Sequence, residues 1–278
     1  MKFGVFNFPT DYGINITDLA VAAEQRGIES LFVCEHTHIP ASRKSPFPGG
    51  GELPKKYAHT HDPFVALSFA AAATKKLTLG TGICLLPQHE PIATAKAIAS
   101  LDLLSGGRFE FGIGGGWNVE EMNNHGVAYK TRFKQMREHI EAMKAIWTQE
   151  EASFQGEFVN FERIWSNPKP ARKPHPPVLL GGETDYSLKR IVEYCDGWIP
   201  RGGPNFDAKV AIGRLNDMAK KHGRDPKELS TTVFRGPLDK KGLDACREAG
   251  VVRVLYEVPD GTNGEAMKAL DDVVALMG

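Results

Sequence analysis

The sequence predicts one α/β domain over residues 1–278, folded as a (β/α)8 TIM barrel with an inserted excursion between the fourth helix and the fifth strand. Two observations favour this fold. Apolar, β-prone runs alternate with helix-like segments eight times, and no change of composition divides the chain. A length of 278 residues is also ordinary for a single barrel. An open, doubly wound sheet shows the same alternation and is the alternative.

The first part of the chain alternates strands and helices around one long loop. Strands are predicted over residues 2–7 and 30–34, with a helix over residues 15–26 between them. A polar connection of residues 35–61 follows, and then an alanine-rich helix over residues 62–75. Because a loop this long inside a compact domain is usually functional or disordered, it is a candidate for shaping substrate access.

The central stretch, residues 77–118, forms one strand–helix–strand unit. Its strands cover residues 77–86 and 108–113, and its helix covers residues 91–104. Both strands are nearly continuous in apolar residues, as expected for parallel strands that are covered on both faces. Each strand ends in glycines, where the backbone could approach a flat ligand closely or simply make a tight turn.

The second half resumes the alternation after one interruption. Helices are predicted over residues 119–125 and 131–147, and the excursion, residues 148–177, has a hairpin-like centre at Gly156 followed by prolines. The remaining strands are residues 178–180, 197–199, 229–234 and 251–256, and the remaining helices are residues 184–194, 207–222, 239–249 and 264–277.

Charge and cysteine content exclude several classes of function. Lys+Arg and Asp+Glu are equal at 34 each, so nothing favours nucleic acid or an anionic membrane as a partner. We find no signal peptide or membrane span, and expect a cytoplasmic protein. The four cysteines are scattered singly, which predicts buried thiols rather than disulfides or a CxxC metal site.

In a barrel the carboxyl ends of the strands carry the site, and here most of these ends are glycine or apolar. Such a face suits a large, planar, partly apolar ligand. After the fifth strand, Gly181 and Gly182 precede a helix whose free N–H groups could bind a phosphate, with Thr184 adding a hydroxyl. A plain turn capped by Thr184 is the other interpretation.

The segment Glu35-His36-Thr37-His38 follows the second strand. A His-x-His pair at a strand end can begin a metal site, since alternate residues point the same way. The ends of strands five, six and seven offer no histidine, which disfavours a metal-dependent hydrolase. We therefore predict that His36 hydrogen-bonds a ligand or moves a proton, and that His38 is a loop residue.

Several motifs in this order resemble one family over nearly the whole chain. They are Glu35-His36 after strand two, LGTGICLLP, SLDLLSGGRFEFGIGGGWN, GVAYKTRF, LLGG and CDGWIP. Together they are similar to the bacterial luciferase-like flavin and deazaflavin oxidoreductases. The GRF-x-x-GxGxGWN pattern looks most like the deazaflavin-dependent branch.

The resemblance implies a (β/α)8 barrel, commonly a homodimer, that binds FMN or the deazaflavin coenzyme F420 at the carboxyl ends of its strands. It predicts an oxidoreductase in which coenzyme F420 exchanges a hydride with a small-molecule substrate. An FMN-dependent monooxygenase is the first alternative, and a deazaflavin-binding protein without turnover is the second.

The resemblance also implies residue roles. His36 would face the reactive ring, with Glu35 beside it as a second catalytic residue, and Gly82-Ile83 would form a non-prolyl cis peptide behind the ring. The cofactor-binding residues implied or suggested are Gly82, Ile83, Gly114, Trp117 and Asn118, the phosphate loop Gly181, Gly182, Glu183 and Thr184, and Arg201, which could offset the charge of the tail.

The chain departs from the family pattern in three places. Light-emitting members have a reactive cysteine where this chain has Gly114, and a second histidine where it has Thr37. Luciferase activity is therefore not expected. FMN-binding members often carry a serine or an acidic residue in the phosphate loop, where this chain has Gly181 and Gly182.

Overall fold

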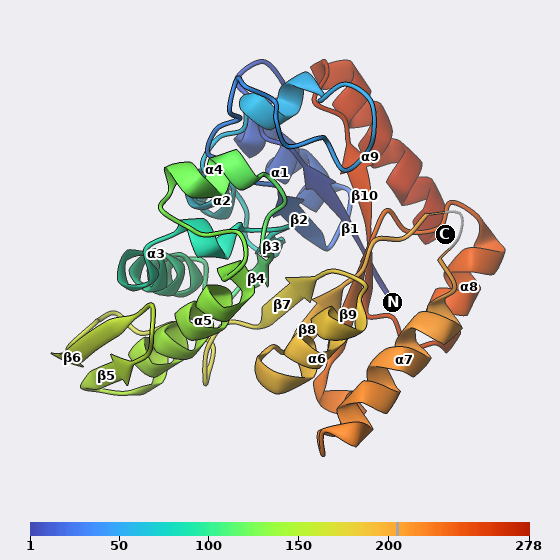
Figure 1. Ribbon diagram of the computed structural model, residues 1–278. Helices are drawn as coiled ribbons and strands as arrows, with labels where there is room; N and C mark the ends of the chain where they lie inside the picture. The colour runs from blue at the N-terminus through green and yellow to red at the C-terminus, as the bar shows by residue number, and fades with distance from the viewer. Residues whose placement is uncertain (204–205) are drawn as a thin grey trace.

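The computed structural model describes residues 1–203 and 206–278 and confirms the predicted barrel (Figure 1). Eight parallel strands close in the order β1-β10-β9-β8-β7-β4-β3-β2, so the first and last strands of the barrel are neighbours. The strands are β1 Lys2–Asn7, β2 Ser30–Val33, β3 Thr78–Thr81, β4 Phe109–Ile113, β7 Val178–Gly181, β8 Gly197–Ile199, β9 Ser230–Phe234 and β10 Arg253–Val258.

Helices surround the barrel and begin where the sequence offers a cap. Asn15, Asp62 and Asn118 each accept a backbone N–H of the first turn of the following helix. The helices are α1 Ile16–Gln25, α2 Pro63–Ala73, α3 Pro91–Leu104, α4 Val119–Asn124, α5 Arg132–Thr148, α6 Asp185–Tyr194, α7 Ala208–Lys221, α8 Lys240–Glu248 and α9 Asn263–Met277. Each lies within two residues of its predicted bounds.

The predicted excursion is an antiparallel hairpin, β5 Ala152–Gln155 and β6 Asn160–Ile164. It projects away from the barrel beyond α5, at the lower left of Figure 1. The side chain of Glu138 on α5 accepts the backbone N–H of Phe158 at 2.7 Å, which ties the hairpin turn to that helix. The hairpin forms a sheet of its own, so the insertion leaves the order of the barrel strands unchanged.

The predicted strand over residues 77–86 is too long. Regular pairing ends at Thr81, the peptide Gly82–Ile83 is cis, and a short 3₁₀ helix, η2, covers Leu86–Gln88. Cys84 returns to the barrel wall, where its N–H donates to Gly112 O at 2.8 Å. The apolar run continues because these residues line the barrel end, so hydrophobicity alone overestimates the strand.

The core has two parts. Residues between the barrel and the helices form the larger one, which includes the predicted stripe of α5; its members Met136, Ile140, Met143 and Trp147 are all buried. A smaller cluster fills the barrel interior, with Phe6, Phe32, Leu179, Ile199 and Leu255 as members. The filled interior leaves the carboxyl ends of the strands as the place for a ligand.

The cysteine prediction is confirmed: Cys34, Cys84, Cys195 and Cys246 are buried free thiols. Within the described residues, no helix combines the length and the apolar character needed to cross a membrane.

Candidate functional site

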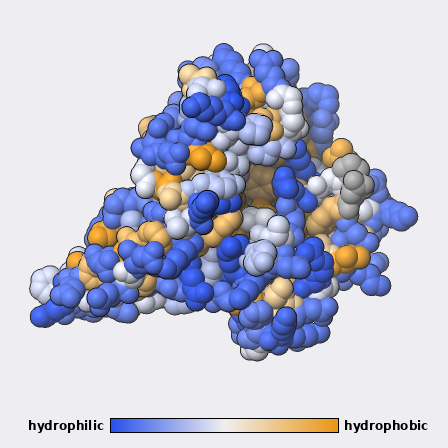
Figure 2. Space-filling view, in the orientation of Figure 1, coloured by the Kyte–Doolittle hydropathy of each residue, from blue (hydrophilic) through white to orange (hydrophobic). Residues whose placement is uncertain are grey.

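The barrel mouth has an apolar base. Phe6 and Phe8 of the interior cluster pack with Ile83, Phe234 and Tyr57. Figure 2 shows a recess between the loop that follows β2 and the ends of β7 to β9, with hydrophobic residues at its base. A flat, partly apolar group fits a surface of this kind.

A second hollow reaches the carboxyl ends of β9 and β10 at Arg235 and Glu257. A groove of about 1040 Å³ runs beside α8 and α9 and is lined in part by Ala245, Cys246, Tyr256 and Val273. The mouth is the better candidate site, because the predicted residues gather there.

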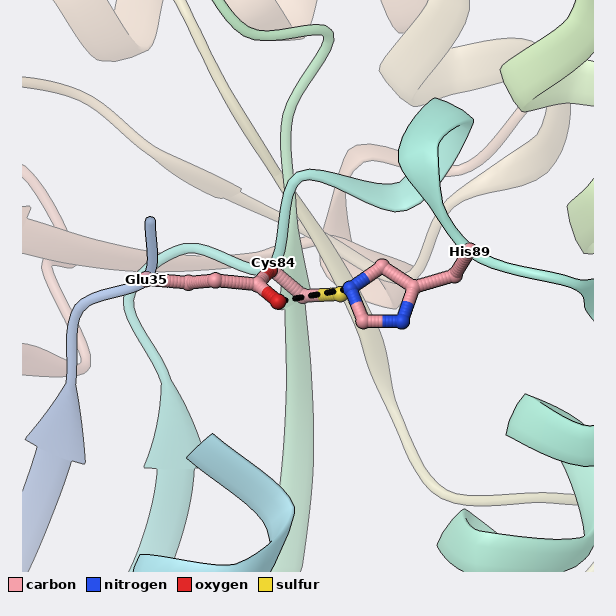
Figure 3. A group of neighbouring side chains, drawn as sticks. All are labelled: Glu35, Cys84 and His89. Carbon is pink, nitrogen blue, oxygen red and sulfur yellow. Dashed lines mark hydrogen bonds and ion pairs between the residues drawn. The ribbon is translucent and has the colours of Figure 1, made fainter. Parts of the chain in front are cut away.

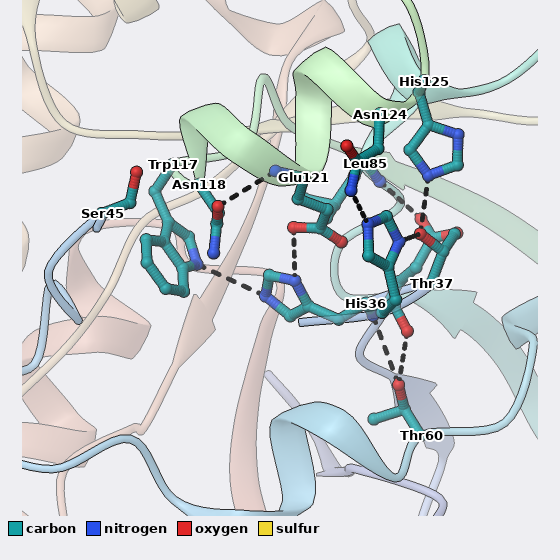
Figure 4. Close-up of polar contacts among 12 residues, drawn as sticks. His36, Thr37, Ser45, Thr60, Leu85, Trp117, Asn118, Glu121, Asn124 and His125 are labelled. Atoms are coloured by element: carbon teal, nitrogen blue, oxygen red, sulfur yellow. Dashed lines mark hydrogen bonds and ion pairs between the residues drawn. The ribbon is translucent and has the colours of Figure 1, made fainter. Parts of the chain in front are cut away.

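His36 makes two hydrogen bonds through its ring (Figure 4). Nδ1 lies 2.8 Å from Oε2 of Glu121, and the indole Nε1 of Trp117 donates to Nε2 at 3.3 Å. A carboxylate only accepts and an indole N–H only donates. Both contacts therefore place the proton on Nδ1 and the lone pair on Nε2.

Local structure fixes the positions of His36 and Glu121. Thr60 Oγ1 accepts the backbone N–H of His36 at 3.3 Å and donates to its carbonyl at 2.8 Å. Asn118 caps α4 by accepting the N–H of Glu121 at 3.1 Å, which sets the direction of the glutamate. Asn118, predicted beside the cofactor tail, is thus buried with a capping bond of its own.

The long loop after β2 is anchored to α4 at two points. Ser45 Oγ accepts the N–H of Val119 at 3.0 Å, and Asn124 donates to Nε2 of His38 at 2.8 Å. Phe47 of the same loop packs edge-on against Trp117, with ring centroids 6.2 Å apart. The loop therefore forms one wall of the site.

Glu35 points to a different partner from His36. Its Oε1 lies 2.6 Å from Nε2 of His89 (Figure 3). Its Oε2 accepts the N–H of Leu85 at 2.6 Å. Burial opposes ionisation of Glu35, but His89 and these hydrogen bonds outweigh it and lower the pKa of the carboxyl group. Burial likewise disfavours the charged form of His89, but Glu35 outweighs it and raises the pKa of the imidazole. The pair holds the loop after β3 in place.

Cys84 lies beside this pair, and one ligand atom from each of Glu35, Cys84 and His89 falls within 4.8 Å of the others. Two ligands at about 2.0 Å from a tetrahedral zinc would stand about 3.3 Å apart. The contact between Glu35 and His89 is 2.6 Å, the length of a direct charged hydrogen bond. Burial also raises the pKa of Cys84 well above its usual value. The geometry is that of an ion pair.

Three predicted residues meet behind the mouth. The peptide Gly82–Ile83 is cis, as the resemblance implies, and Ile83 packs between Gly114 and Gly181. A Cβ on Gly114 would lie 1.8 Å from Cδ1 of Ile83, and one on Gly181 would lie 3.6 Å from Cγ2. Glycine at position 114 therefore makes room for Ile83, and a cysteine there would displace it.

The predicted phosphate loop turns from β7 into α6. Gly182 has φ +119°, in the region that favours glycine, and its carbonyl accepts the indole N–H of Trp198 at 2.7 Å. Thr184 caps α6 by accepting the N–H of Ser187 at 3.1 Å. Arg201 pairs with Glu183 at 2.9 Å, so its charge is already offset by the loop.

Two arginines with no predicted role pack on Phe133, whose ring lies against Gly115 of the strand-four loop. The guanidinium carbons of Arg132 and Arg190 stand 4.3 and 4.0 Å from the ring centre of Phe133. A Cβ on Gly115 would lie 2.6 Å from that ring. Burial lowers the pKa of Arg132, and the charge of Arg190 adds to this. Nε of Arg132 is buried without a partner in the described structure.

These arginines and Glu121 are the residues that sequence reasoning missed. Arg132 stands in the GVAYKTRF motif, and Glu121 follows the glycine-rich segment by a few residues. Their positions in or near these motifs are the only sequence feature that could have indicated a functional role. Arg190 gives no such signal, because only the fold brings it to Phe133.

Comparison with known proteins identifies relatives of the whole chain. A family model described as luciferase-like monooxygenase matches residues 1–249. An uncharacterized protein of Mycobacterium tuberculosis (strain ATCC 25618 / H37Rv) is 40% identical over 281 residues, which cover 99% of this chain and 98% of that protein. An FMNH(2)-dependent dimethylsulfone monooxygenase of Pseudomonas putida is 30% identical over 221 residues, covering 73% of this chain and 61% of its own.

Solved structures share the fold at lower identity. A monooxygenase from Streptomyces bottropensis has a TM-score of 0.79 at 20% identity, covering 99% of this chain and 98% of its own. A coenzyme F420 dependent tetrahydromethanopterin reductase from Methanopyrus kandleri has a TM-score of 0.74 at 18% identity. The match covers 98% of this chain and 97% of the reductase chain.

Proposed function

The chain belongs to the luciferase-like monooxygenase family, and we propose that it is a coenzyme F420-dependent oxidoreductase that exchanges a hydride with a small organic substrate. One observation carries the proposal: His36, with a lone pair on Nε2, stands at an apolar mouth where Ile83 packs between Gly114 and Gly181. The bound deazaflavin supplies the hydride chemistry, and the protein supplies position and a proton acceptor.

In this proposal the ring lies at the mouth. Ile83 supports one face of the ring, Gly82, Gly114 and Gly181 keep Ile83 in place, and His36 acts at the reacting atoms. Trp117 contacts His36, and so lies near the ring rather than only near the tail. Glu35 takes a positioning role through His89, since that residue occupies its carboxylate.

The anionic tail would lie along the strand ends at β4 and β7. The loop of Gly181, Gly182, Glu183 and Thr184 offers a helix N-terminus, with Arg201 paired to it. Arg132 and Arg190 add two positive charges on the ring of Phe133, which lies against Gly115. The tail of coenzyme F420 carries carboxylates as well as a phosphate, whereas FMN carries one phosphate. Two further cations therefore favour the deazaflavin.

An FMN-dependent monooxygenase is the second candidate. The FMNH(2)-dependent relative of Pseudomonas putida supports it, since it is 30% identical to this chain. A deazaflavin-binding protein without turnover is the third, because the same mouth would serve binding alone.

A fluorescence titration with coenzyme F420 and FMN side by side tests the proposal. We expect saturable binding of coenzyme F420 at micromolar concentration and much weaker binding of FMN. Tight FMN binding with oxygen consumption, and no binding of the deazaflavin, would overturn it. The His36→Ala variant separates turnover from binding: we expect it to keep affinity and lose hydride transfer. No transfer by the wild-type protein to any of a panel of carbonyl and hydroxyl substrates would favour the binding protein.

The arginines give a second test of the tail site. We expect Arg132→Gln and Arg190→Gln each to weaken coenzyme F420 binding about tenfold, with a reduced dependence on salt, because each removes one charge near the tail. The matched control is Arg163→Gln, on the exposed hairpin where Arg163 pairs with Glu151. Equal losses in all three variants would contradict the assignment.

A further inference from the structure

We propose that Glu121 is a positioning residue that holds His36 in one tautomer, with the proton on Nδ1 and the lone pair on Nε2. The inference rests on the proposed function, in which His36 acts at the barrel mouth, and it adds the residue that orients it. Glu121 extends from the first turn of α4 and is 0% exposed, and His36 is 6% exposed. Their 2.8 Å contact is therefore shielded from water.

The two buried carboxylates near the mouth differ in how they are satisfied. Glu35 accepts bonds on both oxygens, from His89 and from the N–H of Leu85. Glu121 accepts one, from His36, while its Oε1 is buried with no partner among the residues described. Burying a carboxylate with few donors costs several kcal/mol, so a glutamate serving stability alone would have both oxygens bonded. The contact with His36 accounts for its burial.

Glu121 and Trp117 both favour the same tautomer of the His36 imidazole. If the proton were on Nε2 instead, the lone pair of Nδ1 would face the carboxylate of Glu121. The N–H of Nε2 would then face the indole N–H of Trp117. The observed contacts exclude that tautomer. A neutral His36 therefore takes up a proton at Nε2, and Glu121 stands beside the positive charge that results. The bond from Trp117 is long, at 3.3 Å, so a ligand atom can replace it.

Nitrogen-15 NMR of the histidine side chains tests this without cofactor. The chain has nine histidines, and the His36 signals are assigned by their loss in His36→Gln. At alkaline pH we expect the proton of His36 on Nδ1 in the wild-type protein. In Glu121→Gln the amide can donate as well as accept, and we expect a measurable population with the proton on Nε2.

The matched control is Glu120→Gln, which changes the neighbouring carboxylate, bound to the N–H of Ser45. We expect its His36 spectrum to equal that of the wild-type protein. A proton on Nε2 in the wild-type protein, or a Glu121→Gln spectrum identical to it, would refute the inference. If Glu121→Gln does not fold, Trp117→Phe decides: the Nε2 signal should shift while the proton stays on Nδ1, and movement of the proton to Nε2 would refute the role of Glu121.

Kinetics supply a readout that a structural role would not give. For Glu121→Gln we expect kcat to fall about 10- to 100-fold, as for other residues that orient a reacting imidazole, with the Kd for coenzyme F420 changed less than about twofold. If Glu121→Gln lowers both the Tm and the affinity for coenzyme F420 while the tautomer of His36 is unchanged, Glu121 has a structural role instead. If coenzyme F420 does not bind at all, the proposed function fails, and the NMR result still decides the inference.

Discussion

At the scale of single residues, neighbouring positions of one strand end serve different purposes. Glu35 and His36 are adjacent and point to opposite sides, as residues of an extended chain do. Glu35 meets His89 in an ion pair behind the barrel wall, and His36 meets Glu121 and Trp117. In the sequence, Glu35 and His36 are both polar residues after a strand. Only their partners in the structure indicate that Glu35 supports the loop and that His36 is available for the proposed chemistry.

Gly114 offers a prediction at the same scale. In Gly114→Ala the new Cβ would lie 1.8 Å from Cδ1 of Ile83, so Ile83 must shift from its place behind the mouth. Overpacking of this kind costs about 1 to 3 kcal/mol. We expect the affinity for coenzyme F420, measured by fluorescence, to fall about tenfold.

The matched control for this change is Gly213→Ala. Gly213 lies within α7, and a Cβ there meets no atom within 4 Å. We expect the control to keep its affinity and to gain about 0.5 to 1 kcal/mol in urea unfolding, because alanine restricts the unfolded chain and favours the helix. Unchanged affinity in Gly114→Ala would show that Ile83 does not touch the ring.

At the scale of elements, a buried cation joins the amino ends of three segments. Arg253 of β10 pairs with Glu29, just before β2, and with Glu110 of β4, both at 2.7 Å. Lys2 of β1 also reaches Glu29, at 2.8 Å. Strands that are far apart in sequence are thus held together at the end of the barrel opposite the candidate site.

This network predicts a loss of stability in acid. Burial opposes ionisation of Glu29, but Arg253 and Lys2 lower its pKa to about 2, below its usual 4.5. A group with a lowered pKa in the folded state stabilises the protein above 4.5, and this contribution is lost as the pH falls from 4.5 toward 2. In Glu29→Gln we expect a smaller free energy of unfolding at pH 7 and a flatter decline in acid, measured by urea titration. An unchanged acid decline would contradict the assignment.

At the scale of the whole molecule, two neighbouring helices expose several apolar side chains. Helices α2 and α3 lie side by side (Figure 1), and they expose Phe69 (63%) and Leu104 (86%), together with Val65 and Leu103. Single exposed apolar residues are normal, but a group on two packed helices favours an interface. We therefore propose a homodimer through this face.

Charge placed on the face tests the dimer. We expect Phe69→Glu with Leu104→Glu to convert a dimer to a monomer in sedimentation velocity, because each buries a carboxylate in an apolar interface. Val210→Glu, at a 58% exposed position of α7, is the control and should remain dimeric. A monomeric wild-type protein would refute the proposal.

The sequence by itself determined the barrel and its order of elements, and it predicts that the carboxyl ends of the strands carry the site. These follow from local signals: the period of apolar residues, helix caps and glycines at strand ends, each read within a few positions. The resemblance added the cis peptide Gly82–Ile83, which the structure contains. The length of β3 was wrong because burial at the barrel end and strand pairing have the same apolar signature.

Only the tertiary structure decided which polar residues meet. Glu35 and His89 are 54 positions apart, His36 and Glu121 are 85 apart, and Arg190 reaches Phe133 from another helix. No periodicity relates such pairs, because their contact depends on how strands and helices close around the barrel. The role proposed for His36 depends on those contacts, since they fix the nitrogen that carries its proton.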